Sequence, residues 1–398
     1  MKVSRWANLI LLLCSSCFCL WLLEFSLYVL GSSPGSSTDE EFDSRSKLEV
    51  YDSLNQVNPN SVNLLVTPSM LIAEANRQSI KQPLTGEANR RSIACNESGQ
   101  YVLFQSDRHG FRNSNSIWDT SDDTWVLVGD SYVQGWCVNE GESLSGQLTR
   151  LSERAVLNLG QGGSGPLMEL AILTEFGFQA KPRKVLWFYC EGNDLITELQ
   201  TELASPTLRS YFNDEYTRNL FDDAAKDQEF VREYVKEMIE VERLRVSGEF
   251  RREVIKFLKL GRIREALGIV RQSNLDPIDY SKVSLDDEFF EILTKAFKRV
   301  RDSGSDFHFI YLPTYSRYAQ TNVDHDSFRS KKELLDKVEA LGIDTLDIHD
   351  LVFADNEDPL GLFPFRRRNH YTPEGFRLIA EALYKDINSA PKLDSVSQ

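Results

Sequence analysis

Histidine, cysteine and positive charge are all in short supply in this chain. Its 398 residues include 5 His and 6 Cys, and no Cys/His spacing matches a structural zinc site. There are 45 Lys and Arg against 60 Asp and Glu, so the formal net charge is −15, which argues against the basic surface that binds nucleic acid. The sequence therefore implies no metal, no organic cofactor and no nucleic-acid partner.

The few cysteines also exclude a disulfide scaffold. Three of the six lie in an apolar N-terminal stretch, and the others are Cys95, Cys137 and Cys190. An odd number allows at most one internal disulfide among the three. Free buried cysteines are one possibility, and a bond between Cys137 and Cys190 is another if the ends of their strands are neighbours.

The N-terminal stretch is the one long hydrophobic run. Residues 7–30 are almost wholly apolar, and roughly 20 such residues suffice to cross a bilayer as a helix. Lys2 and Arg5 precede the run and acidic residues follow it, so the positive-inside rule places the N-terminus in the cytoplasm. A cleaved signal peptide is the alternative, although its apolar core is usually only ~7–15 residues long. We expect a single-pass membrane anchor and an extracytoplasmic domain, either periplasmic or extracellular.

The rest of the chain divides by composition. Residues 1–30 form the cytoplasmic tip and transmembrane anchor. They are followed by a flexible Gly/Ser/acidic linker (31–46), a lead-in of short strands and turns (47–120), the main domain (121–390) and a tail (391–398). Within the main domain, a large helical insertion is expected at about 196–300.

Continuous apolar runs alternate with helix-length amphipathic stretches in the main domain. The runs are residues 125–129, 155–160, 184–190, 307–313 and 344–348. Short, fully apolar strands that alternate with helices indicate an α/β fold with a parallel sheet covered on both faces. Ligands bind such sheets beyond the carboxyl ends of the strands.

Four candidate catalytic residues follow three of these strands and precede the last helix. They are Ser131 in GDSY, Gly163 in NLGQGGSGP, Asn193 in GND, and His370. Acyl transfer needs a hydroxyl, a base, and donors aimed at the developing oxyanion. Ser131 and His370 would supply the first two. The Ser131 N–H, the Asn193 amide and a loop N–H would supply the donors, with Gly163 favoured over Gly160 or Gly162.

These four segments, in this order, resemble the blocks of the SGNH/GDSL hydrolase superfamily. The resemblance covers residues 125–195 and 307–387. SDRHGFRNS and GWCVNEGESLSGQL also resemble stretches in membrane-anchored members and in relatives of the alginate O-acetyltransferases. The resemblance implies a three-layer α/β/α flavodoxin-like sandwich, with Ser131 as nucleophile, Gly163 and Asn193 as oxyanion donors, and His370 as base.

One block departs from the family pattern. The family places an aspartate two or three residues before the histidine, and here Arg368 and Arg367 hold those positions. Three explanations are open. A backbone carbonyl orients His370, the site is catalytically weakened, or an upstream aspartate serves as the acid, namely Asp350, Asp355 or Asp358. Arg367 and Arg368 could themselves bind an anionic sugar or carboxylate.

We therefore expect a serine esterase of SGNH type. It would hydrolyse ester groups, most simply O-acetyl groups, on an extracytoplasmic glycan or a small ester through an acyl-enzyme. One alternative is an O-acetyltransferase that acts on a polysaccharide, because the same residues serve both reactions. The other is a weakened binding or assembly protein that keeps the fold.

Overall fold

The computed structural model describes residues 5–31, 42–120, 123–260, 263, 285, 287–319, 329–367 and 370–389. Most of the expected linker, Arg368 and the tail lie outside the described residues. The chain divides into two compact units, of which one comprises Met1–Phe42 with Glu237–Pro277 and the other Asp43–Lys236 with Ile278–Gln398. The site described below lies entirely in the second unit.

The main sheet has five parallel strands. In spatial order they are β5 (Val156–Asn158), β4 (Thr124–Val128), β6 (Pro182–Cys190), β7 (Asp306–Leu312) and β8 (Asp344–Asp347). Each strand falls in one of the apolar runs, so the predicted parallel α/β fold is confirmed. Numbered along the chain, the order is 2-1-3-4-5, which is the flavodoxin-like arrangement. The chain reverses its direction across the sheet at β4, and this is where such folds bind ligands.

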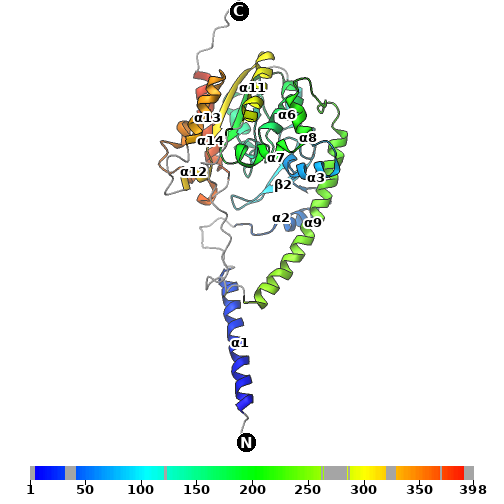
Figure 1. Ribbon diagram of the computed structural model, residues 1–398, viewed down its shortest axis with the longest axis vertical. Coiled ribbons are helices and arrows are strands. Elements are labelled where there is room, and N and C mark those ends of the chain that lie inside the picture. The colour runs from blue at the N-terminus through cyan, green and yellow to red at the C-terminus, as the bar shows by residue number, and fades with distance from the viewer. Residues whose placement is uncertain are drawn as a thin grey trace, which may run out of the picture. The chain divides into compact units, whose positions relative to one another are not determined.

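Side chains alternate between two hydrophobic cores on opposite faces of the sheet. In β4, Val126 and Val128 contribute to one core, and Trp125 and Leu127 to the other. Helices α6 (Pro166–Phe176), α11 (Asp287–Asp302) and α13 (Arg329–Ala340) cover the first face. Helices α5 (Leu144–Ser152) and α14 (Pro373–Ser389) cover the second. The result is the predicted three-layer sandwich, whose covering helices can be followed by colour in Figure 1.

The lead-in forms a small second sheet. Strand β1 (Asn63–Leu64) pairs in parallel with β2 (Arg91–Cys95), which pairs antiparallel with β3 (Val102–Gln105). The remaining elements of this segment are α2 (Lys47–Val57), η1 (Pro68–Leu71), α3 (Ile72–Gln78) and η2 (Asn115–Asp119). Helix α2 begins at a capping box, in which Ser46 and Glu49 satisfy each other's backbone amides. The turn between β2 and β3 carries residues 96–101.

The segment expected to be a helical insertion contains several helices in its described part, joined by turns and coil. It contains η5 (Asp194–Glu198), α7 (Leu199–Leu203), α8 (Pro206–Arg209), η6 (Ser210–Phe212) and α9 (Ala225–Leu258). Helix α11 also lies within the range 196–300, but its Phe289, Ile292 and Leu293 are fully buried in the first core. It therefore belongs to the sandwich and not to an insertion. Most of residues 261–286 lie outside the described part.

Short elements complete the described chain. They are α4 (Ser131–Gln134), η3 (Glu140–Glu142), η4 (Gly177–Ala180), α12 (Tyr315–Ala319), η9 (His349–Phe353), η10 (Pro359–Leu362) and η11 (Pro364–Arg366). In the other unit, the apolar N-terminal run forms the single helix α1 (Arg5–Gly31). None of the helices in the described part of the chain reaches the length and hydropathy needed to cross a membrane. The prediction of a transmembrane helix is thus unsupported here.

Candidate active site

The turn after β4 presents the predicted nucleophile. Gly129 follows the strand, and a Cβ there would lie only 2.5 Å from Val133 Cγ2, so the tight turn requires glycine. The Asp130 carboxylate then caps α4 by accepting a hydrogen bond of 2.9 Å from the Tyr132 amide. Helix α4 begins at Ser131, which is partly exposed. The sequence therefore places Ser131 at the carboxyl end of β4, as predicted.

His370 lies against Ser131 despite a separation of 239 residues. The Ser131 Oγ and His370 Nε2 are 2.8 Å apart, which confirms the predicted contact. The next residue, Tyr371, is buried and its hydroxyl donates to the Pro313 carbonyl. Thr372 then caps α14 by accepting from the Gly375 amide at 3.1 Å. The imidazole is held by the start of this helix.

The acid that orients His370 is Glu97, in the turn between β2 and β3. Both carboxylate oxygens lie 3.0 Å from His370 Nδ1, and Oε2 also accepts from the His370 amide at 2.9 Å. Burial opposes ionisation of Glu97, but the hydrogen bonds and charge of His370 outweigh it and lower the pKa of this carboxyl. The other imidazole nitrogen is thereby left facing Ser131.

None of the three aspartates named from the sequence holds the imidazole, so that expectation is corrected. Asp358 accepts two hydrogen bonds from Arg366, at 2.7 and 2.5 Å. Asp350 is exposed and pairs with Lys331 at 3.2 Å, and Asp355 is exposed in the turn that follows η9. Glu97 instead reaches the imidazole from the turn of the small sheet. A backbone carbonyl is not the partner either.

A disulfide joins the loop carrying Glu97 to the segment carrying Ser131. Cys95 ends β2, two residues before Glu97, and is bonded to Cys137, six residues after Ser131. Cys190 is free and buried, so the alternative pairing of Cys137 with Cys190 is wrong. The bond fixes the acid and the nucleophile to each other across two sheets.

The segment SDRHGFRNS supports the same turn. The buried Arg112 donates to the carbonyls of Gly135 and Val138, which follow α4. Asn113 exchanges two hydrogen bonds of 2.9 Å with the backbone of Asn158, at the end of β5. These contacts connect the lead-in to both strand ends that frame Ser131.

In the glycine loop, Gly163 has the amide that suits an oxyanion donor. Its φ of +71° is natural only for glycine. In the described residues no acceptor is bonded to the Gly163 N–H. The three preceding amides are all engaged, Gly160 by Asn158, Gln161 by Gly129 and Gly162 by Gln134. The structure thus favours Gly163 over Gly160 and Gly162, in agreement with the sequence.

Asn193 lies beside the nucleophile turn, but its amide hydrogens are already donated. One goes to Asp130 Oδ2 and the other to Glu198 Oε1, both at 2.9 Å. Burial raises the pKa of both carboxyls, of Glu198 well above its ordinary value. The predicted convergence of Asn193 on the oxyanion position is therefore only partial, because the amide faces two acids.

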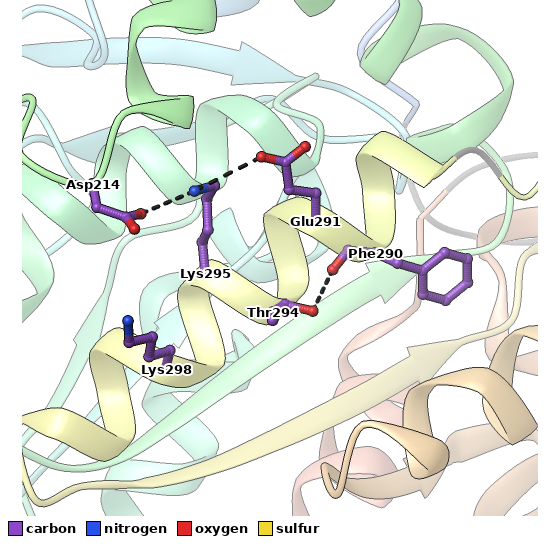
Figure 2. A pocket seen from close by; sticks show the side chains of 6 residues that line it. All are labelled: Asp214, Phe290, Glu291, Thr294, Lys295 and Lys298. Carbon is purple, nitrogen blue, oxygen red and sulfur yellow. Dashed lines mark hydrogen bonds and ion pairs between the residues drawn. The ribbon is translucent and has the colours of Figure 1, made fainter.

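A hollow on the surface of α11 is a separate feature. It is lined by Asp214, Phe290, Glu291, Thr294, Lys295 and Lys298. Figure 2 shows Lys295 between two carboxylates, 3.0 Å from Asp214 and 3.7 Å from Glu291. It shares no residue with the group around Ser131.

No protein-family model and no curated protein matches the chain. Solved structures do. A member of the lipolytic protein G-D-S-L family from Veillonella parvula DSM 2008 is 10% identical over 68% of this chain and 100% of that chain, with a TM-score of 0.36. A lipase/acylhydrolase from Enterococcus faecalis is 14% identical over 67% and 96%, with a TM-score of 0.35. The psychrotrophic esterase EstA from Pseudoalteromonas sp. is 12% identical over 67% and 98%, also at 0.35.

The G-D-S-L name belongs to the family that the four segments resemble. At these identities and TM-scores, the similarity adds nothing to the roles of individual residues. Those roles are therefore argued from the contacts around Ser131.

Proposed function

We propose that the protein is a serine esterase of SGNH type with a Ser131–His370–Glu97 triad. The observation that carries this proposal is the continuous chain of hydrogen bonds from Ser131 Oγ through the imidazole to Glu97, at 2.8 and 3.0 Å. A nucleophile needs a base within hydrogen-bond reach, and the base needs an acceptor that fixes its tautomer. All three groups are present at the carboxyl end of the sheet.

In the first step, His370 Nε2 takes the hydroxyl proton while Ser131 Oγ bonds to the ester carbonyl carbon. Glu97 accepts the Nδ1–H and stabilises the imidazolium that forms. The amides of Ser131 and Gly163 donate to the oxyanion, and Asn193 joins them when it releases one hydrogen from Glu198. Collapse of the intermediate expels the alcohol, which takes the proton from His370. Water then attacks the acyl-enzyme with the same base.

A sugar ester is the substrate that the surroundings of His370 suit best. The half-buried Trp136 lies with its ring centroid 5.9 Å from that of His370, and Lys47 is 5.9 Å from the Trp136 ring. A flat aromatic face beside the base offers a sugar ring a stacking surface. Arg367 is exposed and follows η11, three residues before His370. Together with Arg368 it would bind an anionic sugar. We propose O-acetyl groups on a glycan as the substrate.

The Cys95–Cys137 disulfide supports a location outside the cytoplasm, because such bonds persist in oxidising compartments. Attachment to a membrane through residues 7–30 stays a prediction from the sequence alone.

The two alternative functions fare differently. Trp136 beside the base also favours a sugar hydroxyl as the second nucleophile, and this would make the enzyme an O-acetyltransferase. A catalytically weakened binding protein is disfavoured. That alternative arose because arginines stand where the family has an aspartate, and Glu97 takes the place of that aspartate.

Hydrolysis of an aryl acetate by the full-length protein tests the proposal. We expect Ser131→Ala to remove activity above the uncatalysed rate, and a serine-directed phosphonate to label the wild type but not this variant. Equal hydrolysis by both proteins would rule out the esterase. Release of free acetate against acetyl transfer to an added glycan separates the hydrolase from the transferase.

A further inference from the structure

Five carboxylates lie close together by the nucleophile turn. One follows β4 and the others come from α6, η5 and α7; they are Asp130, Glu169, Asp194, Glu198 and Glu202. All but Glu198 are at most 2% exposed. In the described part of the chain no Lys or Arg forms an ion pair with any of them. A folded protein seldom buries so many acids together without a compensating positive charge.

The hydrogen bonds of the five are unevenly satisfied. Glu202 accepts from the backbone amides at the start of α6, from Gly165 at 2.6 Å and Leu167 at 3.0 Å, and needs no other partner. By contrast, both oxygens of Glu169 lack a hydrogen-bond donor in the described structure, as do one oxygen of Asp194 and one of Glu198. Buried oxygens left without donors are costly unless a further ligand satisfies them.

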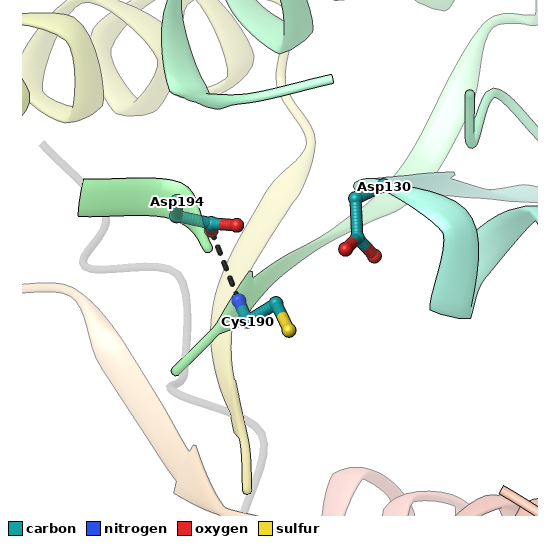
Figure 3. Close-up of side chains that lie close together, drawn as sticks. All are labelled: Asp130, Cys190 and Asp194. Atoms are coloured by element: carbon teal, nitrogen blue, oxygen red, sulfur yellow. Dashed lines mark hydrogen bonds between the residues drawn. The ribbon is translucent and has the colours of Figure 1, made fainter. Parts of the chain in front are cut away.

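Three atoms of this cluster already have the arrangement of metal ligands. A carboxylate oxygen of Asp130, one of Asp194 and the Cys190 sulfur all lie within 4.8 Å of one another. Figure 3 shows the three side chains, with Asp194 also accepting from the Cys190 amide at 2.9 Å. The fully buried Glu169 belongs to the same acidic cluster, but its carboxylate is not among the three groups that lie within 4.8 Å of one another.

We propose that Asp130, Asp194 and Cys190 bind one divalent metal ion of the zinc class. Zinc accepts thiolate and carboxylate ligands together and usually binds them in a tetrahedron. Calcium and magnesium bind oxygen ligands and do not favour a thiolate. Ligand atoms on a tetrahedral zinc are about 3–4 Å apart, so the three groups need only small rotations to close on it.

This site departs from the expectation of no metal, which was drawn from Cys/His spacing. Two of its three ligands are carboxylates. Asp130 follows β4, Cys190 ends β6 and Asp194 begins η5, and the fold brings the three together. The ion would tie the turn of Ser131 to the end of β6. It would also neutralise the charge that lies beside the oxyanion position. The inference does not depend on the esterase proposal.

Metal content and spectroscopy of the full-length wild-type protein test the site first. After incubation with Zn²⁺ and removal of excess, we expect about one zinc per chain, a raised melting temperature, and no comparable effect of Mg²⁺ or Ca²⁺. Protein loaded with Co²⁺ should show the near-ultraviolet absorption of a thiolate–cobalt bond. Wild-type protein that retains no metal and shows no such absorption overturns the proposal, whether or not it hydrolyses esters.

Matched variants assign the ligands. Cys190→Ser should lose the thiolate–cobalt absorption, whereas Cys19→Ser, at an exposed cysteine of α1, should keep it. Asp194→Asn should weaken zinc binding. Glu175→Gln should not, because this buried glutamate of α6 has its own donors, among them the Leu220 amide at 2.9 Å. A cobalt absorption that survives Cys190→Ser refutes the ligand set. Should a variant fail to fold, the wild-type spectrum still decides.

Discussion

Replacement of Glu97 by glutamine is the sharpest perturbation of the site. The glutamine has nearly the same shape, but one of its two oxygens becomes an NH₂ group. Glu97 accepts from both His370 Nδ1 and the His370 amide, at 3.0 and 2.9 Å. Because both carboxylate oxygens lie 3.0 Å from Nδ1, either orientation of the glutamine amide places its NH₂ group against the Nδ1–H, which it repels. The imidazole then turns, or takes the tautomer whose Nε2 carries a proton and cannot accept from Ser131.

The size of the loss follows from the role. Changing the orienting acid of a Ser–His–Asp triad to its amide lowers kcat about 10⁴-fold, or roughly 5 kcal/mol of transition-state stabilisation. The Glu97 carboxylate is one-fifth exposed, with 19% of its side-chain area accessible, so water can partly replace it. We therefore expect Glu97→Gln to lower kcat by about 10²–10⁴, with KM little changed because Glu97 acts through His370.

Aryl-acetate kinetics on the folded variant measure this loss. Asp355→Asn, Asp358→Asn and Asp350→Asn are matched controls, because each makes the same chemical change at an acid that does not contact His370. We expect their kcat to stay within about twofold of wild type. If Glu97→Gln kept full activity while one of the three controls lost 10²-fold or more, the assignment of the acid would be refuted.

Four further predictions concern the same site. Burial opposes ionisation of Glu97, but the contacts with His370 outweigh it and lower the pKa of this carboxyl below 4.5. Wild type should therefore be more stable than Glu97→Gln above pH 4.5, and this difference should vanish as the pH falls through the lowered pKa. Urea unfolding at a series of pH values measures the difference. The Cys95→Ser/Cys137→Ser double variant opens a loop of 42 residues and should lose about 4 kcal/mol of unfolding free energy. It should also change kcat more than KM. An unchanged kcat would show that the disulfide does not position Glu97. Gly163→Ala should lower both melting temperature and kcat, because its φ is +71° and its Cβ would lie 2.6 Å from Ser69 Oγ. Asn193→Ala should cost about 10²–10³ in kcat, and a loss below tenfold would show that its amide stays with the two carboxylates.

The fold was largely predictable because its strands are buried on both faces. Five continuous apolar runs mark them, and every one became a parallel strand. Ser131 and His370 were found for a related reason, since each directly adjoins an element whose boundary is clear in the sequence. Helix α11 was assigned to an insertion because its amphipathic pattern does not reveal which surface it covers.

The orienting acid was missed because sequence distance is a poor guide to it. The three aspartates named from the sequence are close to His370 along the chain, whereas Glu97 is 273 residues away. Its turn contains no motif that signals catalysis. The one available signal was the possibility of a disulfide among Cys95, Cys137 and Cys190. A Cys95–Cys137 bond would have placed Glu97 near Ser131. The hydrogen bonds of the Asn193 amide were not predicted either, because its acceptors Asp130 and Glu198 come together only in the folded chain.

The origin of Glu97 changes how the chain is divided. Residues 47–120 were predicted to be a lead-in of short strands and turns, yet they supply Glu97, the acid of the proposed triad. They also supply one half of the disulfide and Arg112, whose guanidinium donates to the carbonyls that follow α4. Among the described residues, the carboxylate that contacts His370 Nδ1 comes from this segment and not from residues 121–390. If the proposed triad is correct, the catalytic unit therefore begins before the first strand of the sandwich.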